Sequence, residues 1–326
     1  MKTSMLKEIF AVCLFMAAGA ALAQGSWKPE KTVELVVGVA AGGAVDKSAR
    51  EMQRIFKGLG IENTVVVNKP GGGNTLSWVY LNQHAGDGHY VLVQAPNLLT
   101  NKIHGVTQLT YSDFSPLCLL LEEYMAVSVR ADSPIKTGRE LIEQLKKDPS
   151  ALSIAVASAL GNHIHTAIAK PLKTSGIELK KLKVVAFKSS GDSVIALLGG
   201  HIDVVSSSTP NAVAQLRNGK TRILAVTAPR RFGGDLAGVP TWAEQGVDGT
   251  FSSWRGLLGP KGLNARQIAY WEGMCAKLTD NDTWKKSLAH EFWAPRYLGS
   301  AEVTKYWASQ YKEYRDILGE IGLAKD

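Results

Sequence analysis

The hydrophobic pattern of the chain begins with an apolar strand, a glycine loop and an amphipathic helix. Residues 33–39 are apolar and rich in valine, which predicts a buried strand. Gly42 and Gly43 follow and permit a tight turn with positive φ. The next apolar residues recur at helical spacing on one face: Val45, Ala49, Met52 and Phe56. Such a loop and helix start suit an anion, but the same pattern also fits an ordinary αβ turn without a ligand.

Two further strands, predicted at residues 63–67 and 90–94, continue this order of elements. The first ends in residues 68–74, where three consecutive glycines favour a close approach of the backbone to a ligand, although a flexible surface loop is the alternative. The second ends at Ala95 and Pro96. The order β-α-β-α-β predicts a parallel sheet covered by helices, and ligands of such sheets bind beyond the carboxyl ends of the strands.

The pattern restarts after a break at Asp132, Ser133 and Pro134. Before the break, residues 114–121 and 125–129 form two more apolar runs. After it, strands alternate again with loops and helices, and the strands are predicted at residues 153–156, 184–187, 202–205 and 223–226.

We therefore predict an α/β fold of two domains, each a mostly parallel sheet flanked by helices. The first domain comprises residues 24–131 plus 251–326, and residues 132–250 are inserted as the second. We expect the chain to cross between them near residues 129–133 and 250–254. The C-terminal part is predicted to be helical, with a core-facing set of side chains: Val303, Trp307, Tyr314 and Leu318.

The first 23 residues have the pattern of a secretory signal peptide. Lys2 and Lys7 precede an apolar run that ends in Ala-Leu-Ala, so we expect cleavage near Ala23 and a mature protein in the periplasm. Two cysteines remain in the mature chain, Cys118 and Cys275. Export permits a disulfide, but Cys118 lies in an apolar run where a buried free cysteine is also common, so their pairing stays open.

Charge and motifs exclude several classes of function. The net charge is +8, yet no Lys/Arg run exceeds two residues, which argues against a nucleic-acid partner. The chain has no dinucleotide-binding, P-loop or nucleophile-elbow motif at the required places and no evident pair of nucleophile and base, so we expect no enzyme and no cofactor. His163 and His165 lack an evident third ligand, so we expect no metal site.

Two polar residues of the second domain permit two interpretations each. His165 is either a ligand contact or a histidine that bonds local backbone at a helix start, and Asp203 is either a site carboxylate or a cap. The loops that remain are rich in Gly, Ser and Asn, which supply backbone and hydroxyl donors. They are suited to binding an anion without transforming it.

Several motifs, each weak alone, occur in the order typical of a known family. They are Gly42-Gly43 with Asp46 and Arg50, the turn over residues 68–73, and residues 196–203, 224–227 and 239–244. Together they resemble the Bug-type, TctC-like solute receptors of tripartite tricarboxylate transporters, over nearly the whole mature chain. The chain departs from the family pattern at Gly38, Val39 and Val45, so we expect a pocket of different shape or greater apolarity.

The resemblance implies a monomeric periplasmic binding protein of the Venus-flytrap, type II-like class that closes on a small organic carboxylate. Its partners would be the membrane permease subunits of a tripartite tricarboxylate-type transporter, or alternatively a sensor kinase. In the first domain, the implied ligand-binding residues are Ala41, Gly42, Gly43, Ala44, Asp46, Gly72, Gly73, Asn74 and Pro96. In the second, they are Ser158, Asn162, His165, Ser189 and Ser206.

The expected mode of binding follows from the residues of the first two loops. Backbone N–H groups of Gly42, Gly43 and the turn over residues 71–73 are expected to hold a carboxylate without an arginine clamp. Asp46 would repel a nearby anion, so we expect it to accept hydrogen bonds from loop N–H groups or to face a non-anionic part of the ligand.

Overall fold

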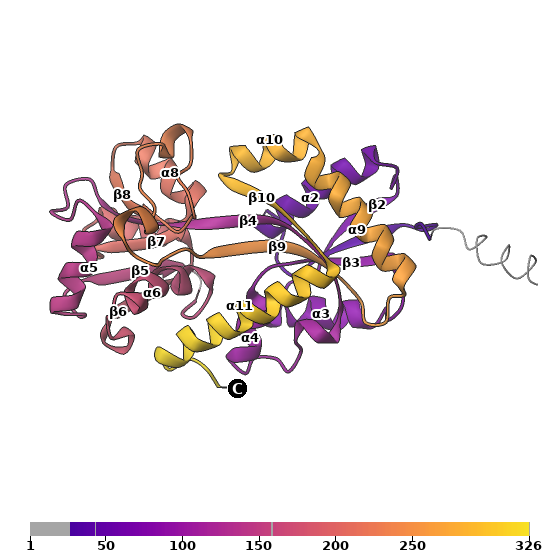
Figure 1. The fold of residues 1–326 in the computed structure, drawn as a ribbon, viewed down its shortest axis with the longest axis horizontal. Helices are drawn as coiled ribbons and strands as arrows, with labels where there is room; N and C mark the ends of the chain where they lie inside the picture. The colour runs from indigo at the N-terminus through magenta and orange to yellow at the C-terminus, as the bar shows by residue number, and fades with distance from the viewer. Residues whose placement is uncertain (1–26, 43, 158, 326) are drawn as a thin grey trace, which may run out of the picture.

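The structure is a computed structural model that describes residues 27–42, 44–157 and 159–325. The predicted signal peptide and the predicted site residues Gly43 and Ser158 lie outside the described residues. Two lobes lie side by side, and β4 (Ser115–Arg130) and β9 (Ser252–Gly259) run from one toward the other (Figure 1). The fold is the predicted α/β fold flanked by helices, but its sheet is mixed and not mostly parallel, because β4 and β9 pair antiparallel with their neighbours.

The first lobe is built on three parallel strands in the order β2-β1-β3, namely β1 (Val33–Val37), β2 (Thr64–Asn68) and β3 (Tyr90–Gln94). β9, β4 and β10 (Trp293–Gly299) extend this sheet, each antiparallel to its neighbour. The helices are α2 (Ala44–Gly58), α3 (Thr75–Asn82), α4 (Asn97–Ile103), α9 (Ala265–Asp280), α10 (Asp282–His290) and α11 (Ser300–Glu320). As predicted, α2 buries the face that carries Met52 and Phe56.

The second lobe repeats this plan with a parallel order β7-β5-β6. Its strands are β5 (Ser153–Ala157), β6 (Lys183–Phe187), β7 (Val204–Ser208) and β8 (Thr221–Val226), and β7 and β8 pair antiparallel with β4. Its helices are α5 (Gly138–Lys147), α6 (His163–Thr174), α7 (Ser190–Leu198) and α8 (Thr209–Arg217). The sequence pattern of strands alternating with helices is therefore confirmed here too.

β4 corrects one expectation, because the two predicted apolar runs form a single strand. The acidic residues that separate the runs, Glu122 and Glu123, are both buried and each forms an ion pair with an arginine, so they do not interrupt the strand. β4 pairs with β9 up to Tyr124 and with β7 and β8 from Met125 onward. This change of partner precedes the crossing that we predict near residues 129–133, and the exact domain boundaries stay a prediction.

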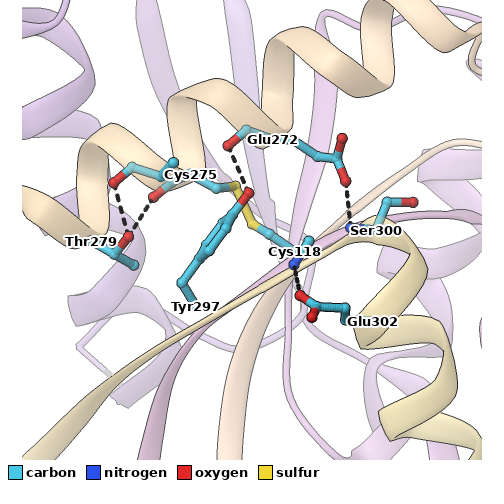
Figure 2. Close-up of a disulfide and its surroundings, with 9 residues drawn as sticks. Cys118, Glu272, Cys275, Thr279, Tyr297, Ser300 and Glu302 are labelled. Carbon is cyan, nitrogen blue, oxygen red and sulfur yellow. Dashed lines mark hydrogen bonds between the residues drawn. A yellow bond between two sulfur atoms is a disulfide. The ribbon is translucent and has the colours of Figure 1, made fainter.

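The C-terminal helices are held in place by the packing of α11 on α4 and β4, and also on α6 of the second lobe, and by a disulfide. The predicted inner face of α11 is fully buried at Val303, Trp307, Tyr314 and Leu318. A disulfide joins Cys118 of β4 to Cys275 of α9, beside Tyr297, whose hydroxyl donates to the carbonyl of Glu272 (Figure 2). None of the helices in the described part of the chain combines the length and the apolarity that crossing a bilayer would take.

Candidate functional site

The directions of the strands bring the loops of the two lobes face to face. β3 and β4 are both antiparallel to β9, so both run toward the second lobe. β7 is antiparallel to β4, and β5 and β6 are parallel to β7, so these strands run back toward the first lobe. The loops after β1, β2 and β3 therefore face those after β5, β6 and β7 across the space between the lobes (Figure 1).

The turn after β2 depends on its glycines. Gly71, Gly72, Gly73 and Asn74 have φ values of 134°, 56°, 62° and 82°, which is the region that favours glycine and admits asparagine. The three glycines are exposed, and Asn101 of α4 donates to the Gly73 carbonyl at 2.6 Å. The run of glycines thus forms a turn of positive φ that is open to solvent.

Asp46 is held inside the first loop. It is 1% exposed and accepts hydrogen bonds from the Gly42 amide at 2.8 Å, Arg50 Nε at 2.9 Å and Asn68 Nδ2 at 2.9 Å. Burial alone would raise the pKa of Asp46, but these hydrogen bonds and the charge of Arg50 lower it below its usual value. The carboxylate faces loop N–H groups, as expected.

This contact changes the expected role of Gly42. Its amide already donates to Asp46, so Gly42 shapes the loop and does not offer its own N–H to an anion. Ala41 and Ala44 are exposed beside it, whereas Pro96 is buried at the start of α4.

In the second lobe, two predicted site residues build the start of α6. Asn162 caps this helix, because its Oδ1 accepts from the amides of Ile164 and His165, at 3.0 Å each. The Nδ1 atom of His165 accepts from the Gly161 amide at 2.9 Å. Burial and the charge of nearby His104 lower the pKa of His165 to about 4, so the ring is neutral at pH 7. His165 thus has the local backbone partner of a helix-start histidine, and its assignment as a ligand contact stays a prediction.

The remaining polar residues of the second lobe also have partners within it. Ser189 accepts from the Asp192 amide at 3.1 Å, and the buried Ser206 hydroxyl donates to the Ile164 carbonyl at 3.0 Å. Asp203 accepts from the amide and hydroxyl of Ser153, which is the capping interpretation. The assignment of Asn162, Ser189 and Ser206 as ligand contacts stays a prediction.

A buried ion pair on the strands between the lobes was missed by the sequence reasoning. Arg255 Nη2 lies 2.9 Å from Glu123 Oε2, with the two side chains 3% and 5% exposed. Burial and the charge of Arg255 lower the pKa of His163 to about 3, which places this pair near the start of α6. The sequence did contain a signal for this ion pair: each of two apolar strands carries a charged residue, Glu123 in β4 and Arg255 in β9.

The described residues include no evident metal site. Within residues 27–42, 44–157 and 159–325, no cluster of three or more His, Cys, Asp or Glu side chains could hold an ion.

Comparison with known proteins identifies the fold and its family. The profile of the tripartite tricarboxylate transporter family receptor matches residues 49–323. The chain belongs to this receptor family. The predicted resemblance is thereby confirmed, as is the expectation of a periplasmic solute-binding receptor and not an enzyme, because the members of this family are binding receptors.

Individual relatives are similar along nearly their whole length. The receptor is 29% identical to the UPF0065 protein in the gbd 5' region of Cupriavidus necator, over 96% of this chain and 94% of that protein. A TctC solute-binding protein from Polaromonas, solved without ligand, superimposes with a TM-score of 0.76 at 26% identity, over 90% of this chain and 100% of its own.

Two structural neighbours were solved with ligands and share the two-domain fold. R. palustris Rpa4515 with adipate has a TM-score of 0.75 at 23% identity, over 91% of this chain and 99% of its own. MatC from Rhodopseudomonas palustris with bound malate has a TM-score of 0.68 at 24% identity, over 89% of this chain and 100% of its own.

Proposed function

We propose that the receptor captures a small organic carboxylate between its lobes and delivers it to the permease subunits of a tripartite tricarboxylate-type transporter. The observation that carries this proposal is the facing arrangement of the loops after β1–β3 and β5–β7. Membership of the receptor family supports the transport role. The adipate and malate held by two proteins of the same fold support a carboxylate ligand.

The proposed contacts are made by backbone and not by an arginine clamp. The exposed turn at Gly72 and Gly73 has a fixed left-handed backbone, so its N–H groups need little ordering on binding. The nearby cations are engaged elsewhere. Arg50 pairs with Asp46 at 2.9 Å, and the Lys69 ammonium lies 4.2 Å from the centre of the Tyr80 ring. The carboxylate would therefore meet backbone donors at this turn and at the start of α2.

A thermal-shift screen against aliphatic and aromatic carboxylates, with adipate and malate included, tests this function. A ligand present at about 100 times its dissociation constant should stabilise the receptor by about 2.7 kcal/mol. The neutral amide of each active compound, with every carboxyl group converted, serves as the matched control and should give no shift. If no carboxylate in the panel stabilises the receptor while another class of compound does, the proposal is wrong.

A further inference from the structure

A large cavity lies between the lobes, apart from the predicted carboxylate site. Its volume is about 1060 Å³, and it is lined by α8 and residues 228–234 from the second lobe and by residues 289–296 from the first. None of the predicted site residues that the structure describes is among its lining residues. A volume of this order accommodates a drug-sized organic ligand.

The floor of the cavity lies on the other face of β4 from the Glu123–Arg255 ion pair. Glu122 lines the cavity, whereas the adjacent Glu123 pairs with Arg255, and neighbouring residues of a strand point to opposite faces. Glu122 accepts hydrogen bonds from Tyr124 and Ser252 at 2.8 Å each. The floor is therefore a satisfied polar network that needs no ligand for its own stability.

The wall of the cavity is aromatic and spans the boundary between the lobes. The ring centre of Phe232 lies 5.9 Å from that of Tyr124 and 6.3 Å from that of Phe292, both in edge-on geometry. Phe292 has a φ of 52°, a conformation that bulky side chains rarely adopt. These rings offer apolar edges and faces to a flat ligand.

One cation at this cavity lacks a counter-charge. Three of the lining arginines already pair with carboxylates: Arg217 with Asp235, Arg231 with Glu244, and Arg296 with Glu122. Arg230 is exposed and has no ion-pair or hydrogen-bond partner among the residues that the structure describes. Glu291 lines the first-lobe side, 3.4 Å from His290, so an anionic group is disfavoured there and favoured beside Arg230.

We propose that this cavity is a second binding site, for an aromatic carboxylate whose ring packs against Tyr124, Phe232 and Phe292 and whose carboxylate pairs with Arg230. The ligand would contact both lobes and would thus bind according to their relative position. This site goes beyond the proposed capture of a solute by the facing loops, and neither site requires the other.

Calorimetric titration of the purified receptor with 2-naphthoate tests the proposal. Arg230→Ala should weaken binding at least about fivefold, because a charge-assisted pair is lost, and Arg230→Lys should weaken it by less than about twofold. Arg266→Ala is the matched control, because Arg266 is an exposed arginine of α9 outside the cavity, and it should leave the affinity unchanged. Neutral 2-naphthamide should bind at least about fivefold more weakly than 2-naphthoate.

A second variant tests where 2-naphthoate binds without changing the charge of the cavity. Ala214 of α8 is exposed and lines the cavity, so Ala214→Trp should fill the cavity and abolish 2-naphthoate binding without a loss of thermal stability. Gly72→Val, at the proposed solute site, should leave 2-naphthoate binding intact. The proposal is overturned if 2-naphthoate does not bind at millimolar concentration, if the amide binds equally well, or if Gly72→Val abolishes binding while Ala214→Trp does not.

Discussion

The loops that face each other between the lobes are built in different ways. In the first lobe, residues 71–74 all have positive φ, and Gly71, Gly72 and Gly73 are exposed. In the second lobe, the polar side chains of Asn162, His165 and Ser206 donate to or accept from that lobe's own backbone. The difference fits the proposed binding mode, in which the ligand meets backbone donors of the first lobe, while these second-lobe side chains bond their own loops.

Gly72→Val should have the largest effect on binding. A Cβ at Gly72 meets the Thr75 side chain at 3.3 Å and the φ of 56° is strained for valine, so the turn must change. We expect carboxylate affinity to fall at least about a hundredfold by calorimetry, because the fixed backbone donors are lost. Gly219→Val is the matched control, since Gly219 has a similar φ of 64° in a turn before β8, at the far end of the second lobe. Equal losses in both variants would contradict the role of the turn.

The disulfide of the first lobe should stabilise the receptor against unfolding. The disulfide joins Cys118 to Cys275, which are 157 residues apart in the sequence. Both cysteines belong to the first lobe and are fully buried. Replacing both by alanine should lower the free energy of unfolding by about 4 kcal/mol, a value at the upper end for disulfides because the closed loop is long. Denaturant unfolding measures this loss, and reductant should destabilise the native receptor but not the variant. An unchanged unfolding midpoint in the variant would contradict the prediction.

His165 should make the second lobe sensitive to acid. Its pKa is lowered from 6.5 to about 4, so below pH 6.5 the unfolded chain binds a proton that the native ring does not. Stability should therefore fall as the pH drops from 6.5 toward 4, by up to roughly 3 kcal/mol from this residue. His165→Gln should reduce that dependence when unfolding is measured across this range, leaving the share of His163, whose pKa is lowered to about 3. The same slope in the variant and the native receptor would show that His165 does not titrate as described.

Lys69→Ala should have the smallest effect. The ammonium packs over the Tyr80 ring, and the proposed binding mode uses backbone donors in its place, so carboxylate affinity should change by less than about 1 kcal/mol in calorimetric titration. A loss of affinity as complete as that from Gly72→Val would instead indicate a cationic clamp.

The sequence predicted those parts of the fold that have a local cause. The run of glycines before Asn74 predicted an unusual backbone, and the spacing of apolar residues predicted α2 and the buried face of α11. It did not predict that β4 continues through Glu122 and Glu123, because their arginine partners lie more than a hundred residues away. Two other features also depend on residues far apart in the sequence: the pairing of Cys118 with Cys275 and the cavity between the lobes. Local sequence patterns therefore could not predict them.

Small-angle scattering with and without a bound carboxylate tests the central claim most directly. The ligand would be the compound that gives the largest shift in the thermal screen, added at saturation. If the receptor captures its solute between the lobes, the lobes should approach each other about the β4–β9 strands and the radius of gyration should fall on saturation. An unchanged radius of gyration with calorimetrically proven saturation would contradict capture between the lobes.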